Sequence, residues 1–527
     1  MSVQLSPELE LEVDRIRQIE NDNRDVVESF RWFDNRDSDL DDLMLPENRY
    51  ELGESESLTF LYNLLYDEES ILSKADILRI LTSLKSREDT STFSVDSLEH
   101  CDVQGIQWPA HLREKFILDR DRVGLDSWFY SIENLRQKVR ESINIATYAS
   151  KTDFFEFQRF FSKLKLNITH FQLRNLLCGS NNPRTGVFYP LCYYHDHNLD
   201  PITDQEPDEY NCFFKINRLM PDNLATAKAG AMKLDCIIDS KNLSYNSYSR
   251  ISTITCSNKY LVCGTFEGNY ILSDISVHRE PRVLGEYSLT KSSNGIINNI
   301  LILDDQQVEF ALNDSSLIFV DVTTISTRKT TSPFPINCMA ENPSNRNEIL
   351  VTGDCVDSFI IDKRASGFQS NSVALKGHQD FGFGCDWSPR DENMIITGNQ
   401  DCCVKVWDRR NPHQSLCTWE SALGSMSSHS GPVRNVKFSH GGEYISWAES
   451  LDHVGMVSVT DLMDSPERMQ PRVQSIDFIG KCTGLAFAPS DDDGEYLNIG
   501  VSDCPLGGIM SYKLESKTKL LDFDFLF

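Results

Sequence analysis

The sequence has no long hydrophobic run and few features of an exported protein. In 527 residues, no stretch approaches the roughly 20 apolar residues that a helix needs to span a bilayer. The first residues, MSVQLSPELELEVDR, are acidic and have no apolar core, so we expect no signal peptide. The 15 cysteines lack the spacing of a disulfide framework, and we expect them to be reduced. These absences favour the cytoplasm, the nucleus or both.

Basic residues are also scarce. The chain has 51 Lys and Arg against 79 Asp and Glu, a formal net charge of -28. Binding to a nucleic-acid backbone or to an anionic membrane surface requires clustered Lys and Arg. The composition therefore argues against direct nucleic-acid binding and against membrane binding. Basic proteins, or basic segments of proteins, are better matched as partners.

Familiar catalytic and metal-binding motifs are missing. The sequence has no GxSxG, P-loop, GxGxxG, CxxC or HExxH pattern. The two cysteines at 402–403 have no histidine base at a recognisable spacing, so we interpret them as packing residues. His195 and His197, near Cys178 and Cys192, could share one face of a strand and bind a metal. A surface loop explains them better, and we expect no enzyme, no cofactor and no metal.

The N-terminal third divides into segments that differ in charge and in hydrophobic pattern. Residues 1–56 contain 17 acidic residues and 6 arginines, a balance of −11, and we expect this segment to be disordered. Residues 57–86 have leucines and isoleucines at helical spacing, which predicts a helical hairpin whose second helix is capped by Ser73 or Asp76. We expect the whole of 57–165 to be helical or extended and to dock on the remainder.

From about residue 168 the sequence consists of short β-type runs separated by Gly, Asn, Asp, Ser and Pro, which is typical of an all-β domain. One stretch, residues 375–410, is the most regular. It begins with Gly377-His378 and ends with Trp407-Asp408. This pattern recurs every 40–45 residues in WD40 repeats, each of which forms one four-stranded blade of a propeller.

The physical reason for the pattern is a chain of buried hydrogen bonds. We expect His378 to contact Asp401 in a tight turn, Thr397 to contact His378, and the Trp407 indole to complete the chain. A buried polar network is stable only when every member has a partner. The four residue types are therefore needed together.

Weaker copies of this pattern surround the regular one. They lie at 168–220, 260–274, 310–321, 336–364, 429–461 and 480–503. Seven candidate blades predict one all-β, seven-bladed WD40 β-propeller over about residues 166–515, followed by a tail at 516–527. Strands from both ends of the chain could close blade one.

On these residues the chain resembles a family of poorly characterised fungal and plant WD-repeat (transducin-like) proteins. The similarity lies in DVQGIQW (102–108), HFQLRNLL (170–177), LVCGTFEG (261–268), the 375–410 repeat and IDFIGKCTGLAFAPS (476–490). The resemblance implies a propeller and a cytoplasmic or nuclear interaction protein. It implies no substrate.

The leading hypothesis is therefore a scaffold or adaptor that functions by binding other proteins. The ending Trp407-Asp408-Arg409-Arg410 also resembles the WDxR box of propellers that serve as substrate receptors of cullin-4 ubiquitin ligases. That resemblance implies that Arg410 presents its guanidinium fork to the adaptor, with Asp408 and Arg409 beside it. The simpler interpretation is a common blade ending in which Arg410 is solvated or paired locally.

Three further interpretations remain open. LRNLL (173–177) matches the helical LxxLL motif, but it lies in a run of strand character, and we expect its leucines to pack in the core instead. A chromatin-associated protein that binds basic tails is compatible with the acidic charge. An enzyme on a propeller would require titratable residues that converge at one mouth of the central channel.

Overall fold

The computed structural model describes the following residues, all within one compact unit, Arg49–Phe527. They are 64, 67, 70–85, 90–91, 104, 112, 115–117, 119, 155–162, 164–170, 172–194, 212–220, 234–246, 249–276, 280–303, 305–365, 368, 372–420, 431–463, 473–489, 494–502 and 507–514. The predicted disorder of residues 1–56, His195, His197 and the tail at 516–527 lie outside the described residues.

Five of the sheets have four strands each and form five consecutive blades. Each is a meander of antiparallel strands. Blade one comprises β3 (Cys178–Gly179), β4 (Val187–Tyr194), β5 (Cys212–Leu219) and β6 (Leu234–Asp239). Blade two comprises β7 (Ile251–Cys256), β8 (Tyr260–Thr265), β9 (Asn269–Asp274) and β10 (Arg282–Ser288).

The next three blades repeat this arrangement. Blade three comprises β11 (Ile297–Leu303), β12 (Gln307–Leu312), β13 (Ser316–Asp321) and β14 (Thr327–Thr331). Blade four comprises β15 (Ile336–Glu341), β16 (Glu348–Gly353), β17 (Ser358–Asp362) and β18 (Val373–Leu375). Blade five comprises β19 (Gly382–Trp387), β20 (Met394–Asn399), β21 (Cys403–Asp408) and β22 (Asn411–Glu420).

The sixth sheet has eight strands because one long strand belongs to two blades. β26 (Gln474–Pro489) pairs through its first half with β25 (Leu451–Ser458) and through its second half with β27 (Glu495–Ser502). Blade six therefore consists of β23 (Val433–Phe438), β24 (Tyr444–Glu449), β25 and the start of β26. The short helix α8 (Val459–Met463) follows β25.

Blade seven combines strands from distant parts of the chain. The second half of β26, β27 and β28 (Gly508–Leu514) are joined by β2 (Phe155–Phe161), which pairs with β28 in antiparallel register. A two-residue strand, β1 (Thr90–Ser91), pairs with the outer side of β2. The expected propeller boundary at residue 166 is thus wrong, since the ring begins at Phe155. The blade that unites the two ends is the last one, not the first.

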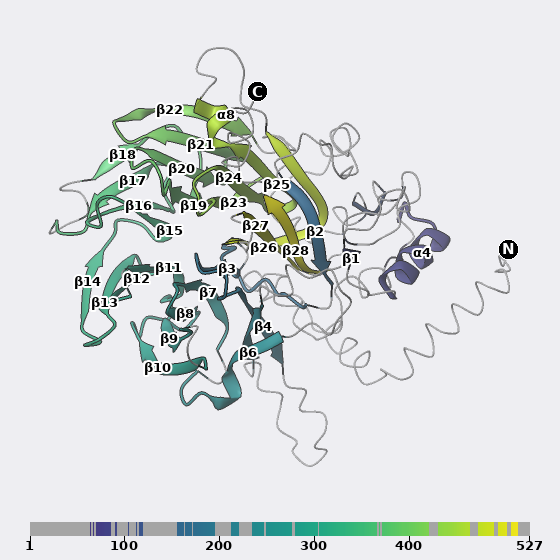
Figure 1. Cartoon of the computed structure of the whole chain (residues 1–527), viewed down its shortest axis with the longest axis horizontal. Helices are drawn as coiled ribbons and strands as arrows, with labels where there is room; N and C mark the ends of the chain where they lie inside the picture. Colours follow the sequence, from purple (N-terminus) through teal and green to yellow (C-terminus); the bar gives the residue numbers. More distant parts are fainter. Residues whose placement is uncertain are drawn as a thin grey trace, which may run out of the picture. The chain divides into compact units, whose positions relative to one another are not determined.

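The described sheets make seven blades whose inner strands meet in a closed ring. Contacts link β3 to β7, β7 to β11, β11 to β15, β15 to β19, β19 to β23, β23 to β26, and β26 back to β3. Figure 1 shows these inner strands gathered around the middle, with β10, β14 and β22 at the rim. The all-β propeller predicted from the sequence is confirmed.

Burial explains why these segments form strands. A central strand such as β8 is buried at every position because both of its faces pack on neighbouring blades. An outer strand such as β14, TRKTT, is mostly exposed and polar, which protects the sheet edge from further pairing. Apolar clusters fill the gaps between blades, and one of them unites Leu350 of blade four with Ile395 and Trp407 of blade five.

Part of the N-terminal region contacts the ring. Helix α4 (Lys74–Lys85) is the second helix of the predicted hairpin, and the hydroxyl of Ser73 accepts a hydrogen bond from the Asp76 N–H at 3.1 Å. The buried Gln104 side chain binds both the N–H and the carbonyl of Ile479 in β26, at 3.0 Å each. Residue 104 is therefore docked on the junction of blades six and seven.

Candidate protein-interaction surface

A continuous chain of hydrogen bonds joins the four residues singled out in blade five. The Trp407 indole donates to the Thr397 hydroxyl at 2.8 Å, and that hydroxyl lies 2.7 Å from His378 Nε2. His378 Nδ1 lies 2.9 Å from the Asp401 carboxylate. Burial lowers the pKa of His378, so the ring is neutral. Its Nδ1–H donates to Asp401, and its Nε2 accepts from Thr397.

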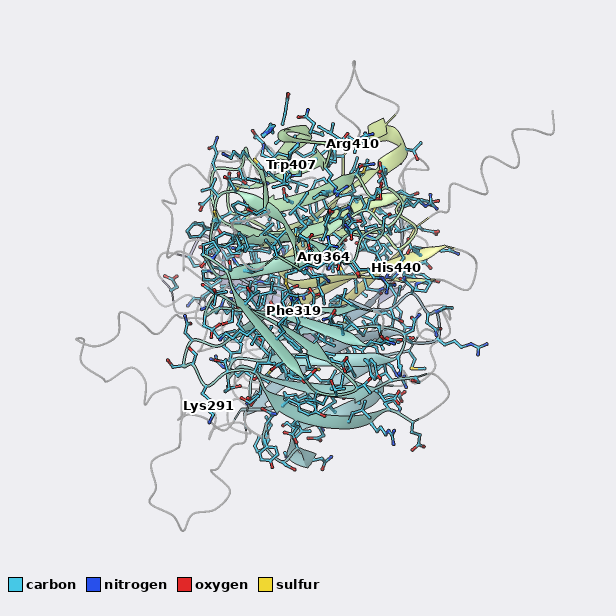
Figure 2. The ribbon with its side chains drawn as sticks, turned by 90° about the vertical axis from the view of Figure 1, so that its left-hand side faces the viewer. Lys291, Phe319, Arg364, Trp407, Arg410 and His440 are labelled. Atoms are coloured by element: carbon cyan, nitrogen blue, oxygen red, sulfur yellow. The ribbon has the colours of Figure 1, made fainter. Side chains whose placement is uncertain are left out.

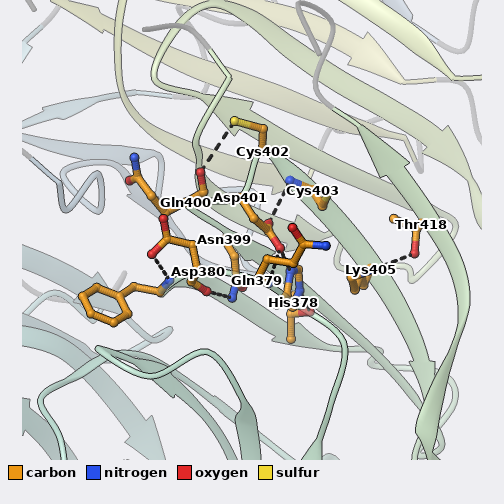
Figure 3. Close-up of polar contacts among 12 residues, drawn as sticks. His378, Gln379, Asp380, Asn399, Gln400, Asp401, Cys402, Cys403, Lys405 and Thr418 are labelled. Atoms are coloured by element: carbon orange, nitrogen blue, oxygen red, sulfur yellow. Dashed lines mark hydrogen bonds and ion pairs between the residues drawn. The ribbon is translucent and has the colours of Figure 1, made fainter. Parts of the chain in front are cut away.

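This network holds two loops together at one face of the propeller. Asp401 also accepts the backbone N–H groups of Gln379, at 2.8 Å, and of Cys403, at 3.1 Å (Figure 3). Cys402 adopts a left-handed conformation, with φ of 64°, that completes the turn. The side chains of the network are buried, so their role is to fix the loop conformations rather than to contact a partner.

The adjacent thiols are unsuited to nucleophilic chemistry. Burial raises the pKa of Cys402 to about 12 and that of Cys403 to about 11. A thiol with so high a pKa is protonated at neutral pH and is a weak nucleophile. Both residues therefore behave as the packing residues that the sequence suggested.

Two apolar side chains are exposed in neighbouring loops of blades four and five. Phe381, in the loop before β19, is 41% exposed, and Val356, in the turn after β16, is 39% exposed. The amide of Asn337 ties this part of the face together, because it donates to Asp354 at 2.9 Å and to the Gly382 carbonyl at 3.0 Å. A contiguous exposed apolar patch marks a protein-binding surface, whereas a single exposed apolar side chain is ordinary, so the candidate surface consists of these two residues together.

The charged residues at the end of β21 have different environments. Arg410 is exposed, and its guanidinium forms a two-point ion pair with Asp408, with Nη2 at 2.7 Å from Oδ2 and Nε at 2.9 Å from Oδ1. Arg409 turns back to blade four and binds the Glu348 carboxylate at 2.6 Å and 2.7 Å. Arg410 is thus paired within its own blade, and Arg409 links blade five to blade four.

Blade four ends in the same way, although it lacks the tryptophan. Arg364 pairs with Asp362 through Nε at 3.0 Å and Nη2 at 2.6 Å, and it is as exposed as Arg410. The intervening Lys363 reaches back to Glu309 of blade three at 2.6 Å. Figure 2 labels both exposed arginines, Arg364 and Arg410. From the sequence, the ending at 361–364 adds little to the WDxR resemblance because it lacks the tryptophan, but the structure gives it the same aspartate–arginine pair as blade five.

The remaining candidates from the sequence do not form a site in the described part of the chain. Residues 173–177 form neither a helix nor a strand, and Leu173, Leu176 and Leu177 are buried. The LxxLL interpretation is therefore wrong. Cys178 lies in β3 and Cys192 in β4. Among the described residues, no group of three or more His, Cys, Asp or Glu side chains is arranged to hold a metal ion.

None of the described helices is long and apolar enough to cross a membrane.

Comparison with known proteins identifies the repeat. Residues 369–408 match the family model described as "WD domain, G-beta repeat". A ribosome biogenesis protein, YTM1, of Chaetomium globosum is 29% identical over 121 residues, which are 22% of this chain and 25% of that protein. A histone acetyltransferase type B subunit 2 of Neurospora crassa is 31% identical over 87 residues, 16% of this chain and 20% of that protein.

Other similarities are of the same kind. A glutamate-rich WD repeat-containing protein 1 of Dictyostelium discoideum is 32% identical over 68 residues, 13% of this chain and 14% of that protein. The alignments thus span a quarter or less of these relatives. A chain from a crystal structure of the mitotic checkpoint complex matches 70% of this chain and 98% of its own length, with 14% identity and a TM-score of 0.48. This chain is an all-β propeller that contains a WD40 repeat at residues 369–408.

Proposed function

We propose that this propeller is a non-catalytic scaffold for protein–protein interaction. The observation that carries the proposal is the face of blades four and five, where the blade-five network fixes the loop that exposes Phe381 and the Asn337 amide ties that loop to the turn that exposes Val356. Rigid loops lose little conformational entropy when a partner binds, so their apolar groups contribute efficiently to affinity. The names of the relatives, which refer to ribosome biogenesis and to histone acetyltransferase, support a role in multiprotein assemblies in the nucleus or cytoplasm.

The test compares two substitutions in blade five. Phe381→Asp alters the exposed loop, and Leu416→Asp places the same charge on the 56% exposed side chain of the outer strand β22. Quantitative affinity purification from cells should recover stoichiometric partners with the wild type and the Leu416 variant, and lose them with the Phe381 variant. Absence of any stoichiometric partner, or equal recovery with both variants, contradicts the proposal.

A narrower form of the same role is a substrate receptor of a cullin-4 ubiquitin ligase. The exposed Arg364 and Arg410 favour it, because each is held at the end of a third strand by the aspartate two residues earlier. Charge reversal of both, R364E with R410E, should abolish co-purification with the cullin-4 adaptor without lowering thermal stability. The proposal fails if the wild type does not co-purify with that complex.

A chromatin-associated role is tested separately, since the net charge of -28 favours basic partners. A peptide from a histone tail should bind the full chain more weakly as salt concentration rises. A neutral peptide of the same length is the control. Equal binding of the two peptides contradicts this role.

A further inference from the structure

Two cysteines face each other across the junction of blades four and five. Cys338 lies in the inner strand β15 and Cys385 in the inner strand β19, and both belong to the apolar cluster that fills the gap between these blades. The Cys385 thiol also donates to the Leu350 carbonyl of blade four at 4.0 Å. The two side chains therefore approach from adjacent blades, although they lie 47 residues apart in the chain.

The sulfur atom of Cys338 lies directly beside Cys385. The Cys338 thiol donates to the Cys385 carbonyl at 3.5 Å, and its sulfur is in hydrogen-bonding contact with the Cys385 thiol. A disulfide bond has a sulfur–sulfur distance of about 2.05 Å. Two thiols that already touch need only side-chain rotation and a small movement of the strands to reach it.

The surroundings of Cys338 favour its thiolate. The Asn299 amide of blade three donates to Cys338 Sγ at 3.9 Å. The hydrogen bond with the Cys385 thiol lowers the pKa of Cys338, and the charge of Lys437 in β23 adds to this shift, although burial opposes it. Burial disfavours the Lys437 ammonium, but Asp386 and the nearby thiols outweigh it and raise the pKa of Lys437. Reactive cysteines typically lie beside such donors and cations.

A second pair of thiols in the ring provides a contrast. Cys178 of β3 and Cys256 of β7 are also in contact, on the inner strands of neighbouring blades. Burial raises the pKa of Cys178 well above its usual value, and the contact with Cys256 raises it further. This pair is more exposed than Cys338 and Cys385. Exposure and thiolate formation thus favour different pairs, so an experiment can separate the two effects.

We propose that Cys338 and Cys385 are a site of oxidative modification, at which hydrogen peroxide converts the two thiols into a disulfide bond between blades four and five. Cys338 is the attacking thiol and Cys385 the resolving thiol. Cys338 is 8% exposed, which suffices for a small neutral oxidant, whereas Cys385 is fully buried. The resting state is the reduced pair that the structure shows.

The reaction has two steps. The Cys338 thiolate attacks one oxygen of hydrogen peroxide and becomes a sulfenic acid, and the hydroxide that leaves combines with the proton that Cys338 released to form water. The Cys385 sulfur then forms the S–S bond, and the sulfenic hydroxyl leaves with the Cys385 proton as a second water. Two thiols are oxidised by two electrons in total, and one peroxide is reduced to two waters.

The disulfide would form next to the candidate interaction surface. Cys338 follows Asn337, whose amide ties Asp354 to the Gly382 carbonyl, and Cys385 lies in the strand that begins at Gly382. Peroxide would therefore link the two blades directly behind their exposed loops. The inference goes beyond the scaffold function and does not depend on it.

The direct test treats the intact, reduced chain with hydrogen peroxide. The chain is then unfolded in N-ethylmaleimide, which blocks the remaining thiols, and digested without reduction for mass spectrometry. The peptide that links Cys338 to Cys385 should form about tenfold faster than the peptide that links Cys178 to Cys256, because one pKa unit changes the thiolate fraction tenfold. Absence of the Cys338–Cys385 link, or its formation no faster than the other link, overturns the proposal.

Two serine substitutions test the roles of the two thiols. Cys385→Ser should leave peroxide-treated Cys338 as a sulfenic acid, which is labelled when the chain is unfolded in dimedone. Cys338→Ser should give no such label at residue 385. Labelling of Cys385 in the second variant, or of neither cysteine in either variant, contradicts the assigned roles.

Two lysine substitutions test the electrostatic contribution. Lys437→Met removes the cation near Cys338 and should slow formation of the disulfide about tenfold. Lys405→Met is the control, since Lys405 lies in β21 of the same blade as Cys385, and its amino group donates to Thr418 in the outer strand at 3.0 Å. The control should react at the rate of the wild type. An equal rate in all three proteins refutes activation of Cys338 by Lys437.

Discussion

At the scale of single residues, the blade-five network depends on hydrogen bonds that have no solvent substitute. Thr397 is completely buried, and its hydroxyl accepts a hydrogen bond from Trp407 and donates one to His378. Removing one partner leaves a buried polar atom unsatisfied, at a cost of about 1–3 kcal/mol. The network is therefore a stability element whose contribution can be measured separately from the packing of its rings.

We predict that Trp407→Phe lowers the free energy of unfolding by about 1–3 kcal/mol more than Trp419→Phe does. Both indoles are buried, but the Trp419 N–H has no hydrogen-bond partner among the described residues. The two substitutions thus remove similar ring volume, and only the first removes a hydrogen bond. Denaturant unfolding measures both. Equal destabilisation would show that the hydrogen bond contributes little.

A second prediction concerns pH and the ion pair between His453 of β25 and Asp477 of β26, whose atoms lie 2.5 Å apart. Burial opposes the charged ring, but the Asp477 carboxylate, with Glu449 and Asp452 nearby, raises the pKa of His453 to about 9. A histidine with a raised pKa in the folded state stabilises the fold fully below its unfolded pKa, near 6.5. That stabilisation is lost as pH rises towards 9.

We therefore expect the free energy of unfolding to fall between pH 6.5 and pH 9, and His453→Gln to flatten this dependence. Glu341 also contributes to the slope, since burial raises its pKa to about 7. Glu341→Gln is the control, and it should flatten the curve between about pH 4.5 and pH 7. A pH profile that is unchanged by His453→Gln would rule out a charged histidine at this position.

At the scale of elements, β26 must turn at the point where it passes from blade six to blade seven. Gly480 has φ of 153°, a conformation that residues with a side chain rarely adopt, and its N–H donates to Asp452 at 2.9 Å. Glycine is therefore required at the junction by backbone geometry. The Gln104 contact to Ile479 lies directly beside it.

We predict that Gly480→Ala destabilises the protein by about 1–3 kcal/mol, because alanine must adopt the same strained φ. Gly441→Ala is the control, since a methyl group there would meet its nearest neighbours at an ordinary 3.8 Å. Thermal unfolding of both variants measures the difference. If Gly480→Ala is as stable as the control, β26 does not turn by this conformation.

Blade five could be predicted from the sequence, because the four residues of its hydrogen-bond network lie within residues 375–410 in a fixed order. The partner of β2 could not, because β2 pairs with β28 at the other end of the chain and nothing local specifies that pairing. Its aromatic residues, FEFQRFF, predict a buried segment but not the strand that it pairs with.

At the scale of the whole molecule, the propeller is a closed set of seven blades whose stability depends on its last blade. Phe160 and Phe161 of β2 are fully buried, so the strand from the N-terminal side contributes to the core as well as to the sheet. An open ring would leave β28 as an exposed edge, with unpaired backbone groups that promote aggregation. Closure therefore makes the faces rigid enough to present binding groups at fixed positions.

Native-state hydrogen exchange, followed by mass spectrometry on the intact chain, tests this closure most directly. The amides of β2 that pair with β28 should be as strongly protected as those of β28, because one cooperative blade contains both strands. The outer strand β10 provides an internal reference for an exposed edge. Fast exchange throughout residues 155–161, with slow exchange in residues 508–514, would show that the ring is not closed by β2.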